Sequence, residues 1–225
     1  MDRHAATAIV LLLLVGTAVA FAETERLKLK PTPIEESFVQ PAFSPVCACK
    51  TSEAEIRIRL SRADTVAVRI LDESAELVRT LVDGKRLPRG RTVLKWDGRD
   101  HSGDPVPDGS YRVDVQLVRA DRTFELPRLI ALDTVPPIVR LVSYTDSVQQ
   151  RQRVRIFYRV SEPAHGALFV DGRRVAVTNT KLRAAKLQWR PQRPGRYRLE
   201  LAALDLAGNL GLRTPPFEVR VTPAA

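Results

Sequence analysis

Apolar residues recur at every second position in short segments along this chain. In residues 55–60, Ile56, Ile58 and Leu60 alternate with glutamate and arginine. The same period recurs in residues 66–70, 111–117, 154–160 and 196–201. A period of two puts one set of side chains on each face of a β-strand. Turn-forming residues separate these segments roughly every ten residues, which is typical of β-sandwiches. We therefore expect an all-β fold.

The most distinctive stretch lies between Trp96, which ends one alternating segment, and Tyr111, which begins the next. The glycines and prolines between them exclude a continuous helix or strand. Pro107-Asp108-Gly109 suits a tight turn. The motif consists of Trp96, Asp97, Gly98, Gly103, Pro107, Asp108, Gly109 and Tyr111. We expect it to form one corner of a sandwich, with the Trp96 ring filling the core.

This motif resembles the Ig-like domain of the flagellar hook-capping protein, the FlgD Ig-like family, which is also appended to many secreted bacterial proteins. The resemblance implies a β-sandwich and a structural role for the motif residues. Relatives often follow Phe-Ser-Pro with an acidic loop, whereas here residues 43–45 are followed by Val46-Cys47-Ala48-Cys49-Lys50. Hard cations need oxygen ligands, so cation binding by this loop is not carried over. Neither is flagellar function, because the export and assembly regions of the hook-capping protein have no counterpart.

The second half of the chain repeats this plan in degenerate form. Trp189 corresponds to Trp96, and Pro194–Leu201 corresponds to the turn and strand that contain Tyr111. Asp171-Gly172 predicts a two-residue type I′ hairpin. Residues 205–209, read together with Asp133–Pro137, resemble bacterial Ig-like repeats of surface proteins. We predict two tandem Ig-like (immunoglobulin/fibronectin III-like) β-sandwiches, at residues 41–134 and 135–222, after an N-terminal hydrophobic export helix.

Residues 1–22 have the pattern of an export signal. Residues 5–22 carry no charge, and Ala20-Phe21-Ala22 has the small residues that signal peptidase requires. The segment is either cleaved as a signal peptide or retained as a membrane anchor, since eighteen uncharged residues just span a bilayer as a helix. Residues 23–40 contain Pro31 and Pro33 and are expected to form an extended tether. The bulk of the chain is predicted to be extracytoplasmic, either secreted or anchored to the cytoplasmic membrane.

The formal net charge of +10 favours anionic partners. In an exported protein these are a cell-wall polymer or an envelope protein rather than nucleic acid. Outward positions carry Arg153, Arg155, Arg159, Arg196 and Arg198, which form a single polyanion-binding patch if their strands are neighbours. The alternative is that these arginines only provide solubility and protect strand edges.

No catalytic, cofactor or metal site is predicted. The histidines are His4, His101 and His165, and no Gly-x-Ser-x-Gly motif accompanies them. The aspartates of the motif loop fit turn chemistry better than a calcium site. Cys47 and Cys49 either pair with each other, pair between chains, or bind metal; a local disulfide is our prediction.

We therefore expect a non-catalytic structural or adhesive protein of the bacterial cell envelope. A first alternative is a carbohydrate-binding accessory module, which requires an exposed Trp96 or Trp189. A second alternative is an unrecognised hydrolase, which requires a cleft near His101 or His165 with a poised nucleophile.

Overall fold

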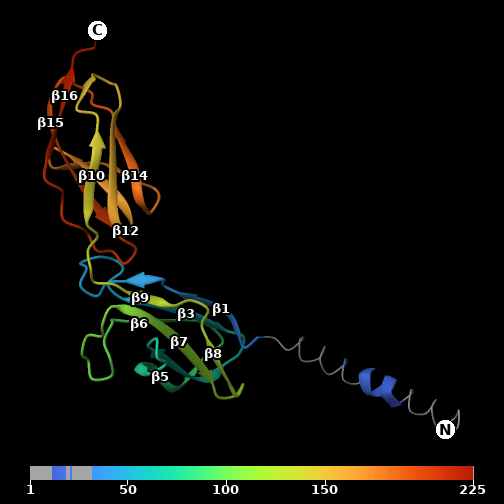
Figure 1. The fold of residues 1–225 in the computed structure, drawn as a ribbon. Helices are drawn as coiled ribbons and strands as arrows, with labels where there is room; N and C mark the ends of the chain where they lie inside the picture. Colours follow the sequence, from blue (N-terminus) through green and yellow to red (C-terminus); the bar gives the residue numbers. More distant parts are fainter. Residues whose placement is uncertain (1–11, 19–20, 22–31, 225) are drawn as a thin grey trace.

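A computed structural model describes residues 12–18, 21 and 32–224. Two β-sandwiches follow one another along the chain (Figure 1), and residues 133–138 between them belong to no strand. Residues 12–18 and 21 are helical. None of the helices in the described part of the chain has the length and apolarity needed to cross a bilayer. The rest of the predicted export segment lies outside the described residues.

The first sandwich packs a three-stranded sheet against a six-stranded sheet. The smaller sheet contains β1 (Ile34–Val39), β3 (Ala54–Leu60) and β6 (Gly90–Trp96). The larger sheet contains β2 (Ala42–Phe43), β9 (Ile130–Leu132), β7 (Gly109–Leu117), β4 (Asp64–Leu71) and β5 (Leu77–Leu87), with β8 (Arg122–Glu125) also paired to β7. All pairs are antiparallel except β2 with β9.

The predicted alternation is confirmed in this domain. Ile56, Ile58 and Leu60 are at most 1% exposed, while Arg59 between them is exposed. They pack with the inward residues of β4 and β7 in a single core cluster. Burying one such branched side chain stabilises the folded domain by about 1.5–3 kcal/mol relative to leaving it exposed. The alternating apolar residues therefore supply much of the domain's stability.

The predicted tether differs from the structure. Residues 34–39 form β1, which pairs antiparallel with β3, so the first sandwich begins before residue 41. Val39 is 1% exposed and belongs to the core. Pro31 and Pro33 favour an extended tether in the sequence, but both precede the strand and therefore do not interrupt its hydrogen bonds. Residues 23–31 lie outside the described part.

The second sandwich is organised around β12 (Val154–Val170), which belongs to both of its sheets. Its first half pairs with β10 (Val139–Tyr144) and β14 (Leu182–Trp189). Its second half pairs with β13 (Arg173–Val177) and β15 (Gly195–Leu204); β15 continues to β16 (Phe217–Thr222) and then β11 (Ser147–Gln149). The sequence pattern predicts two separate strands here, whereas one strand crosses between the sheets.

Two local features allow this arrangement. A Cβ atom at Gly166 would overlap the Tyr158 hydroxyl, so only glycine fits where the second half of β12 passes this ring. Asp171 and Gly172 have φ values of 47° and 78°, which confirms the predicted type I′ turn between β12 and β13.

Candidate functional site

The family motif forms part of the core of the first domain. Trp96 is 1% exposed, and its Nε1 donates a hydrogen bond to the Arg99 carbonyl at 2.9 Å. Its ring packs edge-on against Tyr111, with centroids 4.8 Å apart. The Tyr111 hydroxyl in turn donates to the Pro107 carbonyl at 2.6 Å, which fixes the end of the loop to the start of β7. Trp96 is therefore a core residue and not a surface for stacking sugars.

The carboxylates of the motif loop satisfy its own backbone. Asp100 Oδ1 accepts hydrogen bonds from the Ser102 and Asp104 amides at 2.8 and 2.9 Å. Asp108 accepts from the Thr134 amide and hydroxyl, so it ties the loop to the linker. These contacts agree with the predicted turn chemistry.

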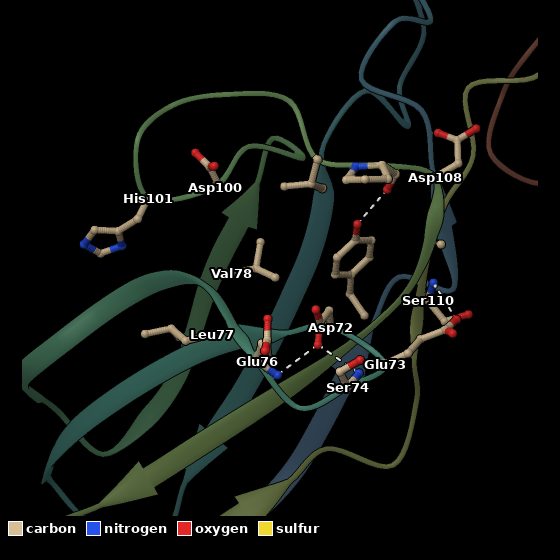
Figure 2. Close-up of a pocket in the computed structure, with 14 residues that line it drawn as sticks. Asp72, Glu73, Ser74, Glu76, Leu77, Val78, Asp100, His101, Asp108 and Ser110 are labelled. Carbon is tan, nitrogen blue, oxygen red and sulfur yellow. Dashed lines mark hydrogen bonds between the residues drawn. The ribbon is translucent and has the colours of Figure 1, made fainter.

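Beside this loop lies a hollow of about 520 Å³ lined by several carboxylates (Figure 2). His101 lies at one side of the hollow, away from Ser74 and Ser110 on the other. Asp72 accepts hydrogen bonds from the Ser74 and Glu76 amides, so its carboxylate also supports a turn. Among the described residues no hydrogen bond links His101 to a serine. The hollow thus shows no paired nucleophile and base of the kind that hydrolysis requires.

The second domain repeats the aromatic corner. The Trp189 and Tyr197 rings meet edge-on with centroids 4.9 Å apart, and the Tyr197 hydroxyl donates to the Arg193 carbonyl at 2.8 Å. Trp189 is half-buried, unlike its counterpart Trp96. His165 Nδ1 lies 2.8 Å from the Thr178 carbonyl, so this ring nitrogen is held by backbone rather than by a nucleophile.

The two domains meet at the cysteine loop. The sulfur atoms of Cys47 and Cys49 are 2.05 Å apart, a bonding distance, which agrees with the predicted local disulfide. Thr51 Oγ1 donates to the Ala207 carbonyl of the second domain at 2.6 Å. Gly208 has a φ of +103° and lies so close to Thr51 and Cys49 that a Cβ atom would overlap them. The sequence indicates residues 205–209 only as part of a resemblance to Ig-like repeats, and it does not indicate Thr51. The contact between Thr51 and Gly208 depends on how the domains are joined.

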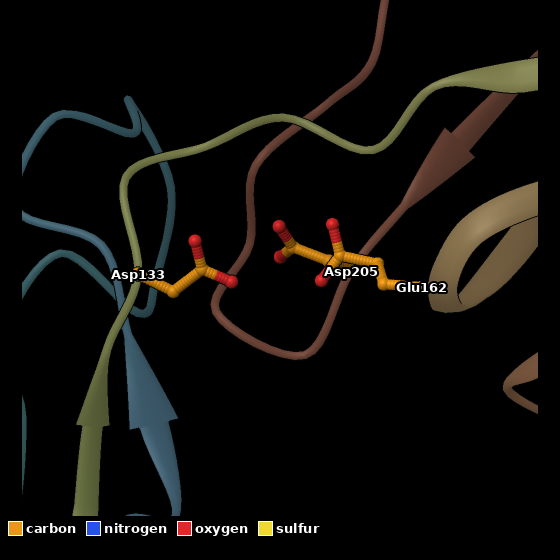
Figure 3. Close-up of side chains that lie close together, drawn as sticks. All are labelled: Asp133, Glu162 and Asp205. Carbon is orange, nitrogen blue, oxygen red and sulfur yellow. The ribbon is translucent and has the colours of Figure 1, made fainter. Parts of the chain in front are cut away.

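Three carboxylates lie close together behind this contact (Figure 3). Oxygen atoms of Asp133, Glu162 and Asp205 lie within 4.8 Å of one another. Burial, and then the charge of the neighbouring carboxylates, raises the pKa of Glu162 above its ordinary value. Burial is also the main cause of the raised pKa of Asp133.

Oxygen ligands suit hard cations, but three carboxylates are fewer than the six to eight oxygens that Ca²⁺ takes. Asp205 Oδ1 already accepts from the Gly208 and Asn209 amides at 2.6 and 2.9 Å, and Oδ2 accepts from Asn209 Nδ2 at 2.8 Å. Asn209 Nδ2 also donates to the Asp133 carbonyl at 2.8 Å, across the junction. The cluster therefore has a structural explanation, and we assign no metal to it.

The predicted arginine patch is divided between two sheets. Arg155 and Arg159 project outward from the first half of β12, in the sheet with β10 and β14. Arg196 and Arg198 project outward from β15, in the opposite sheet. The prediction of one shared face is wrong, because the first half of β12 does not pair with β15. Arg153 precedes β12 and is exposed.

The outer face of the β10–β12–β14 sheet carries cations without carboxylates. Arg140 is directly opposite Arg159, and Lys186 is opposite Phe157, which is 43% exposed. Residues 139–144, 154–160 and 182–189 contain no Asp or Glu. Like charges directly opposite each other destabilise a sheet, so the Arg140–Arg159 pair has a cost that no neighbouring acid offsets. We call this surface, formed by Arg140, Arg155, Phe157, Arg159 and Lys186, the cationic face.

The opposite sheet has mixed charge. Arg198 faces Glu218 across the β15–β16 pair, and Arg196 lines a shallow hollow together with Asp146. The sequence alone does not show that Arg140 and Lys186 belong to the cationic face. Which residues are neighbours across two strands depends on the pairing register, and the pattern of a single strand does not reveal that register.

One known family matches part of the first domain. Residues 45–121 match the family model of the FlgD Ig-like domain. The match confirms the resemblance drawn from the Trp96–Tyr111 motif. The matched residues contain β3 to β7, and they leave β1, β2, β8 and β9 of the first sandwich and the whole second sandwich outside. No curated protein matches the sequence significantly.

Solved structures that resemble the chain are made of Ig-like and fibronectin III-like modules. The fibronectin(III)-like modules of CbhA from Clostridium thermocellum align over 84% of this chain and 95% of theirs, with 13% identity and a TM-score of 0.46. The FN1–FN3 domains of chicken CNTN1 align over 85% of this chain and 69% of theirs, with 14% identity and a TM-score of 0.42. Likenesses this distant carry no argument about function.

Proposed function

We propose that this protein is a non-catalytic structural module of the bacterial cell envelope that binds an anionic wall polymer through the cationic face. The observation that carries this proposal is the charge of that face, where four cations lie together without a carboxylate between them. Guanidinium groups suit the carboxylate and phosphate groups of such polymers.

The spacing of the cations favours a polymer over a small ligand. Arg155 and Arg159 are four residues apart on one strand, which places them about 13 Å apart. Arg140 lies on the neighbouring strand, about 5 Å from Arg159 in the hydrogen-bonding direction. Charges spread over this distance can contact successive anionic groups of a chain, whereas a small anion would contact one or two of them. The exposed Phe157 ring between them offers an apolar surface for a sugar ring.

The rest of the molecule supports a spacer role. The first domain buries Trp96 and Tyr111 of its motif in the core. The described residues contain no paired nucleophile and base in either hollow that adjoins a histidine. Contacts through Thr51 and Asn209 join this domain to the second one. Such a joint presents the cationic face at a fixed place relative to the first domain.

The proposal is tested by comparing two double variants. Arg155→Ser with Arg159→Ser removes two charges from the cationic face, and Arg196→Ser with Arg198→Ser removes two charges from the mixed face. With a soluble polycarboxylate such as polygalacturonate as the probe, we expect the first pair to weaken binding about tenfold, and the control pair to weaken it much less. Equal losses for both pairs would show that binding follows net charge alone and would refute a specific cationic face.

A further inference from the structure

The sheet opposite the cationic face becomes apolar on both of its sides near the domain junction. Along β15 the outward positions are first Arg196, Arg198 and Glu200, and then Ala202 and Leu204. In the second half of β12 the outward positions are His165, Ala167 and Phe169. A sheet with one face in water normally carries polar residues on that face. A stretch that is apolar on both faces is typical of a strand that is covered on both faces.

The outward apolar residues line a groove of about 800 Å³. Small residues form its floor, namely Ala167, Ala202 and Gly211. Larger side chains form its walls, and Val177, Leu204 and Leu210 are 47%, 40% and 61% exposed. Leu212 continues the same segment and is 91% exposed. We call these residues the apolar face. Nothing in the described part of the chain covers it, so these side chains are open to a partner.

The charged residues that line the groove are all basic. Arg213 stacks on the Phe169 ring at 3.9 Å and pairs with Glu200 at 3.1 Å, so its charge is largely engaged. Arg174 also lines the groove and forms no ion pair with any described residue. With no Asp or Glu among the lining residues, the surface complements a partner that is apolar in the centre and anionic at its border.

Two occupants fit poorly. An extended peptide lying over the groove floor would leave its main-chain groups unpaired, because β12 and β15 beneath it already pair on both sides. Among the described strands the outer edge of β13 is open, but a strand added there would lengthen the sheet rather than fill the groove. A second copy of the chain would place like charges together, because each copy carries a net charge of +10 and the same basic border. A lipid surface has neither problem, since acyl chains carry no hydrogen-bonding groups.

We propose that the apolar face docks onto an anionic phospholipid bilayer. Leu210 and Leu212 enter the boundary between headgroups and acyl chains, and Arg174 contacts headgroup phosphates. This is the arrangement of a peripheral surface in which protruding apolar residues are flanked by cations. The site lies on the sheet opposite the cationic face, so it goes beyond the proposed polymer binding and leaves the cationic face free.

A tryptophan reporter in the full chain tests this proposal. The variant Leu212→Trp is mixed with phosphatidylcholine vesicles that contain phosphatidylglycerol and brominated acyl chains. After the wild-type emission of Trp96 and Trp189 under the same conditions is subtracted, we expect the emission of the new tryptophan to shift to the blue and to be quenched by bromine. The matched control Leu129→Trp replaces a leucine of the first domain that is 50% exposed, and it should show neither change. Adding Arg174→Glu to Leu212→Trp should weaken the vesicle affinity at least fivefold.

Several results would overturn the proposal. They are absence of quenching, equal quenching in the Leu129→Trp control, and equal quenching by pure phosphatidylcholine. A blue shift with monomeric dodecanoate but not with vesicles would instead identify a site for single amphiphiles. The polymer proposal is tested separately by the double variant Arg155→Ser with Arg159→Ser. This double variant should weaken polymer binding. Added to Leu212→Trp, it should reduce the bromine quenching less than Arg174→Glu does.

Discussion

The corner of each domain depends on one tyrosine hydroxyl. In Tyr111→Phe the Pro107 carbonyl loses its donor, while the ring keeps its contact with Trp96. We expect a loss of about 0.5–1.5 kcal/mol in the free energy of unfolding, because one partly buried hydrogen bond is lost while water can still reach the Pro107 carbonyl. Tyr197→Phe should cost less, since its bond to the Arg193 carbonyl is exposed to water. Urea unfolding measures both losses, and a larger loss for Tyr197→Phe would contradict this ranking.

Glu162 is predicted to make stability depend on pH. Burial and the neighbouring carboxylates raise its pKa in the folded protein, so the ionised form destabilises the fold. This penalty is fully present above the folded pKa and disappears as the pH falls below the unfolded value of about 4.3. Glu162→Gln should therefore raise the melting temperature at neutral pH and leave it unchanged near about pH 3. A gain of the same size at both pH values would show that charge is not the cause.

Among the elements, the contact between the cysteine loop and residues 205–209 determines how the domains are joined. Gly208→Ala places a methyl group against Thr51 and Cys49 at a residue with φ of +103°. We expect the junction to open, with faster proteolysis in residues 133–138 and a larger radius of gyration in X-ray scattering.

The matched control for this variant is Gly172→Ala. It has a similar backbone strain, with φ of +78°, but open space around the new methyl group. It should lose some stability without exposing the linker. If both variants open the junction equally, backbone strain and not the close approach of the domains is responsible.

The alternating pattern was sufficient to predict most strands and both aromatic corners. It did not predict that β12 is continuous, because a bend at a proline and a glycine looks like a strand end in the sequence. It also did not predict which arginines share a face. Arg155 and Arg159 share a face because they lie on one strand, whereas Arg196 and Arg198 belong to the opposite sheet. Pairing between distant strands depends on the whole fold and not on a local period.

At the scale of the whole molecule, the second sandwich has two chemically different outer surfaces. The sheet of β10, β12 and β14 is cationic, and the opposite sheet is mixed in charge at one end and apolar at the other. The first sandwich joins this one beside the apolar end, through the cysteine loop. Under the two proposals, the molecule binds an anionic polymer on one sheet and a phospholipid surface on the other.

The central claim is that an anionic polymer binds the cationic face, and amide chemical-shift mapping tests it most directly. On titration of the labelled protein with a soluble polycarboxylate, the largest shifts should lie in residues 139–144, 154–160 and 182–189, which form the sheet of the cationic face. Shifts centred on β15 and β16, or spread evenly over both domains, would contradict it.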